Sequence, residues 1–465
     1  MSDYQLIVIG AGPGGYTAAL RAAKLGMKTA VVEAREAGGT CLNRGCVPTK
    51  TLLHASEAYR TAVGSAGIGV HAEGVRADMT EIFAYKRRVS ETLSKGVESL
   101  LKAAKVPLLR GRAVVTAPHT VRVVAPDGTA ADYTADNILI ATGSVPSRPP
   151  IPGLDLPGVM TSDELLEGTD KLYRSIVIIG GGVIGVEFAT FYAELGCAVT
   201  VIEGLDRLLP NMDRELGQNL ALILKKRGVQ VFTGSLVSRV EQDADGLTVH
   251  FTAKGKDAAA SGEAVLCAIG RRAFCDGLFE DGLAPEMNGR SIRVDERYQT
   301  SIEGVYAIGD VSSRVQLAHV AAAQGTACVN LFAGVESGVD MDVTPSCIYC
   351  RPEIATVGMT DAEAKEAGIP VKVGKCVMGG NARTLIADPG RSFMKVVAHA
   401  ETGAIVGAQL MCPNATDMIS QLGEAIANRM TPAQLLRAMR PHPTFEEALS
   451  DALNDLQGKL EKTAN

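Results

Sequence analysis

The amino-acid sequence predicts an α/β protein in which one structural unit occurs twice, followed by an α+β region. Moving the 465-residue chain by 170 positions superimposes two sets of glycines, each with a following glutamate. These sets are Gly10, Gly12, Gly15 and Glu33, and Gly180, Gly182, Gly185 and Glu203. From about residue 341 this signature does not return, and apolar strands at 393–397 and 405–410 alternate with helices. These observations predict two similar α/β domains and a C-terminal α+β domain.

Each copy of the repeated unit contains the elements that a glycine-rich nucleotide loop requires. Strands at 6–9 and 176–179 lead into the glycines, helices at 16–26 and 186–196 follow, and strands at 29–32 and 199–202 end at the glutamates. The three glycines permit the tight turn, the approach of backbone to a pyrophosphate, and the packing of helix on strand. The helix N-terminus offers N–H groups to phosphates, and Glu33 and Glu203 would bind ribose hydroxyls. The sequence therefore predicts two Rossmann-like dinucleotide-binding domains.

Two further stretches return the chain to the first unit. A buried strand ends at Ala141, Thr142 and Gly143, and another ends just before Asp310. The second unit closes near Gly270, and a proline-rich stretch at 146–152 is a hinge into it. We therefore expect the first domain to comprise 1–148 and 271–340, the second 149–270, and the C-terminal domain 341–465.

Composition narrows the class of protein. The hydrophobic content of 46% and the 50 glycines suit an α/β protein, and the length suits about three domains. A net charge of −6 without a long basic run gives no footprint for nucleic acid. We expect no membrane span, because no run of 18 apolar residues is present, and no secretory signal is recognised. The ten cysteines are mostly scattered, which favours a reducing compartment, so a cytoplasmic location is expected.

Cys41 and Cys46 stand five positions apart just downstream of the first glycine loop. They could be half of a zinc site, with Cys347 and Cys350 as the second pair, or buried structural thiols, or a redox pair. The redox pair is favoured, because a helix start and the cations Arg44 and Lys50 should stabilise a thiolate beside the nucleotide loop. No metal is expected. Cys347 and Cys350 are interpreted as ordinary thiols of a strand, whose side chains point to opposite faces.

A histidine near the C-terminus is flanked by prolines. His442 lies between Pro441 and Pro443, in a rigid corner, and most single histidines are structural. The run from Thr444 to Glu447 is typical of a capping box that opens an amphipathic helix.

Together these motifs resemble the flavoprotein disulfide reductases, and among them the NAD-linked dihydrolipoamide dehydrogenases. The resemblance covers nearly the whole chain, through six ordered motifs: the two glycine loops, residues 38–50, 141–143, 307–310 and 442–447. It implies FAD in the first domain, NAD in the second, and a C-terminal domain that forms a homodimer. It also implies lipoyl-bearing partner proteins of a 2-oxo-acid dehydrogenase or glycine-cleavage complex.

The resemblance also implies residue roles. Cys41 is the thiol that exchanges with substrate, and Cys46 is the thiol that contacts the flavin. Lys50 and Glu187 form an ion pair beside the flavin, and Asp310 binds its ribityl chain. His442 is the general base, and Glu447 orients it. Two residues depart from the family's pattern: Arg44 stands where an aliphatic residue is common, and Arg440 replaces a histidine.

The preference for NAD has support in the residues themselves. Glu203 is followed by no basic pair that would hold a 2′-phosphate, although Arg207 lies close by in the sequence. The resemblance implies oxidation of dihydrolipoyl groups through a Cys41–Cys46 disulfide and FAD, and the residues after Glu203 support NAD⁺ as the electron acceptor. The alternatives are an NAD(P)H-dependent reductase of another small disulfide and, in a different class, a subunit whose main role is docking on a multienzyme core.

Overall fold

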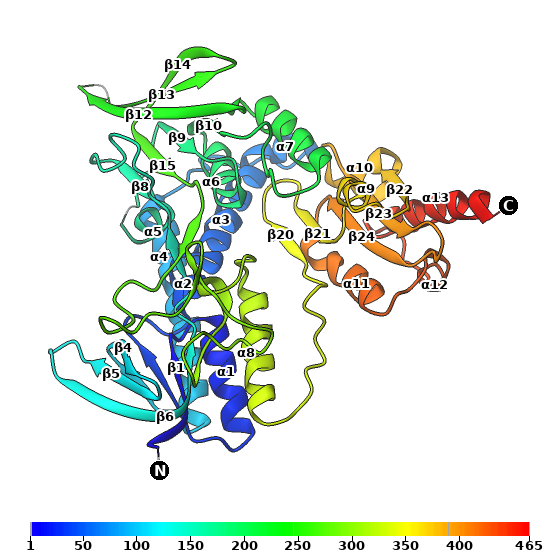
Figure 1. The fold of residues 1–465 in the computed structure, drawn as a ribbon. Coiled ribbons are helices and arrows are strands. Elements are labelled where there is room, and N and C mark those ends of the chain that lie inside the picture. The colour runs from blue at the N-terminus through cyan, green and yellow to red at the C-terminus, as the bar shows by residue number, and fades with distance from the viewer. Residues whose placement is uncertain (1, 169, 245, 389, 465) are drawn as a thin grey trace.

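The structure, a computed structural model, describes residues 2–168, 170–244, 246–388 and 390–464. Figure 1 shows the repeated unit as two separate bodies, with the first glycine loop's strand β1 at the bottom and β9 and β10 at the top. The C-terminal part, coloured orange to red, lies to one side. Within the described residues, every helix is too short or too polar to cross a membrane.

The first sheet combines parallel and antiparallel strands. Its parallel part has the order β3-β2-β1-β6-β19, and β5 and β4 continue it in antiparallel fashion from the first half of β6. The two registers Ile7 to Ala30 and Ile7 to Ile138 place β1 at the centre, and its residues Leu6–Val8 are fully buried. Buried on both faces, such strands contain nearly continuous apolar runs. The strands are β1 (Tyr4–Ile9), β2 (Thr29–Glu33), β3 (Leu108–Arg110), β4 (Arg112–Ala117), β5 (Thr120–Val124), β6 (Ala130–Ile140) and β19 (Val305–Ala307).

Helices α1 and α8 lie side by side against this sheet. They approach so closely that a Cβ at Gly325 of α8 would lie 2.5 Å from the Gly14 carbonyl oxygen of α1, so the contact requires glycine at this position. A second pair, α3 and α4, runs from this sheet toward the second body (Figure 1). The elements are α1 (Pro13–Lys24), α2 (Gly39–Asn43), α3 (Cys46–Gly64), η1 (Ser65–Ile68), α4 (Met79–Ala103), η2 (Gly309–Val311) and α8 (Ala318–Phe332).

The second body repeats the parallel arrangement. Its sheet has the order β11-β10-β9-β15-β8, and an antiparallel sheet, β12-β13-β14, lies beside it. Its strands are β8 (Val159–Thr161), β9 (Ser175–Ile179), β10 (Ala198–Ile202), β11 (Gln230–Phe232), β12 (Ser235–Asp243), β13 (Gly246–Ala253), β14 (Lys256–Gly262) and β15 (Ala264–Cys267). Its helices are α5 (Ser162–Gly168), α6 (Val183–Glu194) and α7 (Arg214–Lys226). Strands β7 (Ser144–Pro146) and β16 (Arg271–Ala273) pair where the chain enters and leaves this body, and β17 (Met287–Asn288) pairs with β18 (Ser291–Ile292).

The C-terminal body is an antiparallel sheet with the order β20-β21-β24-β23-β22. Helix α13 packs on β22 and β23, and α11 packs on β21 and β24. Its strands are β20 (Ser346–Ile348), β21 (Ile354–Gly358), β22 (Val371–Val377), β23 (Phe393–His399) and β24 (Ile405–Met411). Its helices are α9 (Asp361–Glu366), η3 (Met378–Gly380), α10 (Ala382–Ala387), α11 (Ala415–Ala427), α12 (Pro432–Leu435) and α13 (Glu447–Ala464). The α/β fold with an α+β C-terminal region, as predicted, is confirmed.

Candidate active site

The first glycine loop joins β1 to α1 and takes the geometry that the sequence predicts. Gly10 has φ +103°, and a Cβ there would lie 2.5 Å from the Ala141 carbonyl oxygen. A Cβ at Gly15 would overlap the Gly10 carbonyl oxygen. Gly12, in contrast, has only the Gly39 Cα near its missing Cβ, at 4.0 Å, and no side chain caps the helix that it precedes. The loop is therefore shaped for backbone contact with a ligand, with free N–H groups at the helix start.

The second glycine loop repeats this geometry. Gly180 has φ +108°, and a Cβ there would lie 2.4 Å from the Ala268 carbonyl oxygen. Nothing lies within 4 Å of a Cβ at Gly182, which precedes α6 without a side-chain cap. Both loops line one cavity of about 1860 Å³. Because ligand pockets are typically about 300–1,000 Å³, this cavity has room for more than one cofactor.

The two predicted ribose-binding glutamates have matching hydrogen bonds. Glu33 accepts from the N–H groups of Ala11 (2.7 Å) and Arg35 (2.8 Å). Glu203 accepts from those of Gly181 (2.6 Å) and Leu205 (2.7 Å). Each carboxylate is thus fixed beside its glycine loop, on the cavity wall. The residues present fit two dinucleotides, because an uncapped helix start, an open glycine and an oriented carboxylate recur in both copies.

The remaining predicted cofactor residues lie on the same wall: Ala141, Thr142, Gly143, Gly270 and Asp310. Asp310 accepts a hydrogen bond from the Ser144 hydroxyl at 2.6 Å. That hydroxyl in turn accepts from Arg271 Nε at 2.8 Å, and Arg271 also donates to the Ser144 carbonyl oxygen. Ser144 and Arg271 therefore orient Asp310, and the sequence prediction missed both. Their only signal in the sequence is that each directly follows a predicted loop glycine.

The two candidate redox cysteines face the cavity from neighbouring helices. Cys41 lies in the short helix α2, and Cys46 is the first residue of α3. Both are free thiols in this structure. A hydrogen bond from the Cys41 thiol, helped by the charge of Lys50 and opposed by burial, lowers the pKa of Cys46 to about 7. The same hydrogen bond and burial raise the pKa of Cys41. The arrangement makes Cys46 the thiolate of the pair and Cys41 its proton donor.

Lys50 and Glu187 meet beside Cys46, as predicted from the resemblance. Lys50 Nζ lies 2.9 Å from each carboxylate oxygen of Glu187, which also accepts from the Tyr349 N–H at 3.0 Å. Glu187 is only 2% exposed, so it is a buried residue of α6. Burial opposes the charge of Lys50, but the charges of Glu187 and Cys46 hold the pKa of Lys50 above its ordinary value. The pair thus places a fixed cation next to the thiolate.

His442 and Glu447 lie together on the C-terminal body. His442 Nδ1 is 2.8 Å from Glu447 Oε1, and the other oxygen of Glu447 accepts from the Thr444 N–H at 2.9 Å. The backbone hydrogen bond from Thr444 and the contact with His442 lower the pKa of Glu447. His442 is exposed and, among the described residues, is not one of those that line the cavity.

The predicted capping box forms only in part. Glu447 accepts from the Thr444 backbone as expected, but the Thr444 hydroxyl donates to the Pro441 carbonyl oxygen at 2.7 Å. Helix α13 begins at Glu447 itself, so Glu447 is in its first turn rather than at its third position. The reciprocal capping box was therefore a wrong prediction. The hydroxyl instead closes the corner that contains His442.

The second cysteine pair is divided between two environments. Cys347 lies in β20 on the cavity wall, and Cys350 is fully buried with its thiol donating to the Pro352 carbonyl oxygen at 3.2 Å. Both are free thiols. Within the described part of the chain, no three histidine, cysteine or acidic side chains converge as metal ligands.

Comparison with known proteins gives consistent matches over nearly the whole chain. Residues 4–325 match the family model "pyridine nucleotide-disulphide oxidoreductase", and residues 344–453 match its dimerisation domain. The chain is 38% identical to dihydrolipoyl dehydrogenases from Geobacillus stearothermophilus and Bacillus subtilis, covering 97% and 98% of this chain and 95% and 99% of those proteins.

Solved structures agree with this match. LpdA from Mycobacterium tuberculosis is similar with a TM-score of 0.88 at 27% identity, covering 97% of this chain and 99% of that one. The HOCl-induced flavoprotein disulfide reductase RclA from Escherichia coli, as its Cu(II) complex, has a TM-score of 0.87 at 28% identity, covering 98% and 99%. The chain belongs to the pyridine nucleotide-disulphide oxidoreductase family.

Proposed function

We propose that this protein is a dihydrolipoyl dehydrogenase that uses FAD and NAD. The observation that carries the proposal is that two glycine loops and the two free thiols of Cys41 and Cys46 line one cavity. The 38% identity to proteins named dihydrolipoyl dehydrogenase, over 97% of the chain, supports the substrate. The overall reaction converts a dihydrolipoyl group and NAD⁺ into a lipoyl disulfide, NADH and a proton.

Dithiol exchange begins from a disulfide between Cys41 and Cys46. A substrate thiolate attacks Cys41 Sγ, the bond between the two cysteines breaks, and Cys46 leaves as a thiolate. The second substrate sulfur then attacks the first, which closes the lipoyl disulfide and releases Cys41 as a thiol. Cys46 is suited to leave, because the cation of Lys50 stabilises its thiolate. Bound FAD supplies the two-electron chemistry that links this dithiol to NAD⁺.

The first glycine loop and Glu33 would hold FAD, with Lys50, residues 141–143 and Asp310 along its length. The second loop and Glu203 would hold NAD, with Gly270 at the far wall. Support for two separate sites comes from the two uncapped helix starts, at Gly12 and Gly182.

His442 is proposed as the general base that takes the substrate's thiol proton. Its Nδ1 is engaged by Glu447, which leaves Nε2 free to accept that proton. Because His442 is exposed and away from its own chain's cavity, we assign it to the cavity of a second subunit. The match of residues 344–453 to a dimerisation domain supports a homodimer.

The domain limits, partners and location are part of the same proposal. The flavin domain would comprise 1–148 and 271–340, the NAD domain 149–270, and the interface domain 341–465. The pairing of β19 with β6 supports a flavin domain built from two stretches. Lipoyl-bearing proteins of a 2-oxo-acid dehydrogenase or glycine-cleavage complex would be the partners. A cytoplasmic location is favoured by the free thiols.

Steady-state turnover with a panel of dithiols against NAD⁺ and NADP⁺, and of disulfides against NADH and NADPH, tests the proposal. Dihydrolipoamide with NAD⁺ should give the highest kcat/KM, and Cys41→Ser should abolish it. Higher kcat/KM with another small disulfide would instead favour a reductase for that substrate. A protein that binds a lipoyl-bearing complex equally well with and without Cys41, yet turns over no dithiol, would be a docking subunit.

A further inference from the structure

Arg44 is a buried cation within residues 38–50, the segment that contains Cys41 and Cys46 and is called the redox loop below. It lies between the end of α2 and the start of α3, two positions before Cys46, and is 6% exposed. Arginine is almost never this buried unless it is paired. Its backbone N–H donates to the Thr40 carbonyl oxygen at 2.8 Å, which closes the turn that contains Cys41.

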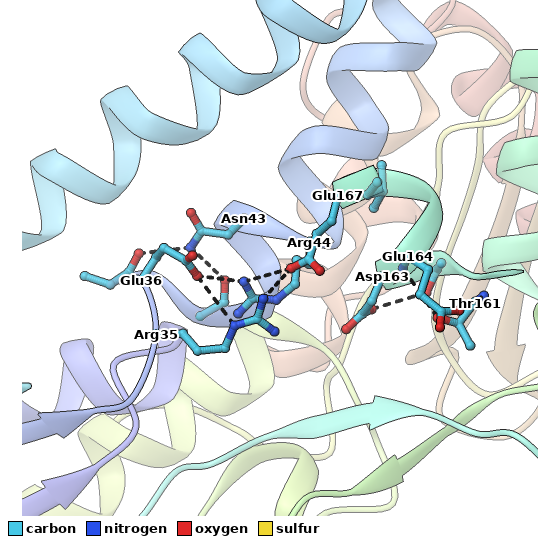
Figure 2. Close-up of polar contacts among 12 residues, drawn as sticks. Arg35, Glu36, Asn43, Arg44, Thr161, Asp163, Glu164 and Glu167 are labelled. Carbon is cyan, nitrogen blue, oxygen red and sulfur yellow. Dashed lines mark hydrogen bonds and ion pairs between the residues drawn. The ribbon is translucent and has the colours of Figure 1, made fainter. Parts of the chain in front are cut away.

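The Arg44 guanidinium bridges two carboxylates from distant parts of the sequence. Nη1 lies 2.7 Å from Glu36 Oε2 and 3.4 Å from Glu167 Oε1, and Arg35 Nη2 lies 2.5 Å from the same oxygen of Glu167 (Figure 2). Burial acts against ionisation of Glu36, yet the hydrogen bond from Arg44 holds the pKa of Glu36 below its ordinary value. The pairing therefore favours the charged form of Glu36.

Glu167 belongs to α5, which directly follows strand β8 of the second body and is held by contacts from both bodies. Asp163 at its start pairs with Arg271 at 3.3 Å, and Glu164 accepts from the Thr161 N–H at 2.6 Å. At its other end, Lys86 of α4 donates to the Leu166 carbonyl oxygen. Polar contacts therefore hold both ends of α5 where Glu167 meets Arg44.

The other side of the loop is also anchored. The Asn43 amide donates to the carbonyl oxygens of Ala37 and Gly39, both at 3.0 Å, and Gly38 N–H donates to the Ala11 carbonyl oxygen at 2.8 Å. The two Asn43 bonds brace the turn that contains Cys41, and the Gly38 bond joins it to Ala11 of the first glycine loop. Arg44 is the residue of the loop that ties it to the second body.

We propose that Arg44 is a positioning residue for the dithiol, which anchors the loop to Glu36 and α5 and so holds Cys41 and Cys46 in their relative positions on the cavity wall. The inference rests on the dithiol step of the proposed function, not on lipoyl groups as the substrate. Arg44 acts through geometry, because its guanidinium pairs with Glu36 and Glu167, while the nearby charges with the largest effect on Cys46 are Lys50 and Glu187.

Alkylation of Cys46 tests the proposal without substrate or turnover. The rate of iodoacetamide labelling at Cys46 of the fully reduced protein is followed by mass spectrometry from pH 5 to pH 9. Wild type should show a midpoint near pH 7. Arg44→Met should raise the midpoint by about one unit, which slows labelling at pH 7 about fivefold. Arg44→Lys should recover much of this shift, because it restores a cation. Arg122→Met, which removes an exposed pair with Asp132, is the matched control and should not move it.

A double-variant cycle then tests the route through α5. Glu167→Gln should shift the midpoint in the same direction but less, since Glu36 remains. Added to Arg44→Met, it should produce no further shift. Should Arg44→Met not fold, Glu167→Gln and Arg44→Lys carry the same test, because Glu167 is about two-fifths exposed. An unchanged midpoint in a less stable Arg44→Met protein would show a merely structural residue and overturn the proposal. Shifts that simply add would overturn the coupling through Glu167.

Discussion

Lys50 lies in α3, one helical turn after Cys46, and its Nζ is 2.9 Å from both carboxylate oxygens of Glu187. After the hydrogen bond from Cys41 and the opposing effect of burial, these two charges have the largest effects on the pKa of Cys46. The cation lowers it and the carboxylate raises it. The ion pair therefore adjusts the pKa of Cys46 through the difference between two opposing charges.

Substitutions of Lys50 and of Glu187 should shift the pKa of Cys46 in opposite directions. Lys50→Met should raise the pKa of Cys46, since the lowering charge is lost and the anion of Glu187 remains. Glu187→Gln should lower it, since the cation then acts alone. One unit would correspond to about 1.4 kcal/mol. Alkylation rate against pH measures both, with thermal unfolding as the check on folding, because a broken buried pair is itself destabilising. Shifts of the same sign would contradict the electrostatic account.

Cys46 should also be the thiol that contacts the flavin. The purified protein should be yellow, and its two-electron-reduced form should show a long-wavelength absorbance band from thiolate to flavin. Because the pKa of Cys46 is lowered to about 7, the thiolate persists above that pH and the band should fade as the pH falls through it. Cys46→Ser should remove both the band and lipoamide turnover. Retention of the band in this variant, with loss in Cys41→Ser, would reverse the assignment of the two thiols.

NADH should be preferred to NADPH. Glu203 is held beside the second glycine loop by the Gly181 and Leu205 N–H groups, and its carboxylate fits a free 2′-hydroxyl but repels a phosphate. A lost polar contact or an unpaired charge costs about 1–3 kcal/mol, so kcat/KM should differ by at least about tenfold. Glu203→Gln keeps an oxygen acceptor for the loop and should reduce the ratio of kcat/KM for NADH to that for NADPH. Equal use of both cofactors by the wild type would refute this account.

The repeated unit could be predicted from sequence because its contacts are local. Glu33 and Glu203 bond to loops only 22 residues away, and the strand, glycine turn and helix are contiguous in each copy. The same periodic patterns predicted β1, β9 and the helices that follow them, although both helices begin a few residues earlier than expected.

Contacts between distant segments were not predictable in this way. Arg44 reaches Glu167 across 123 residues, and Tyr349 donates to Glu187 across 162. The spacing of residues in the sequence does not indicate that Arg44 and Glu167 are partners, because an arginine in a loop and a glutamate in a short helix are usually solvated. At Thr444 the side chain had two acceptable partners, and the corner carbonyl of Pro441 was preferred over the helix N-terminus.

His442→Gln should lower lipoamide turnover by about 10²–10⁴-fold, the usual cost of removing a positioned base. Reduction of the bound flavin by NADH should stay near wild type, because the proposed role of His442 is to take the proton of the dithiol substrate. Glu447→Gln should have a smaller effect in the same direction, since it keeps a hydrogen-bond acceptor for His442 but loses the charge. Rapid-mixing absorbance separates the two half-reactions. Equal loss in both would indicate a folding defect rather than a missing base.

Mixing two inactive variants tests whether His442 serves the other subunit. His442→Gln chains keep the cysteine pair, and Cys41→Ser chains keep the histidine. If the site is shared, heterodimers contain one complete centre, the intact Cys41 loop of one chain with the intact His442 of the other. Activity should then rise toward about a quarter of wild type in an equal mixture, because half of the dimers are mixed and each has one of two centres. Mixing without subunit exchange is the control. If the site lay within one chain, no mixing ratio would restore activity, and the exposed corner at His442 would then need another role.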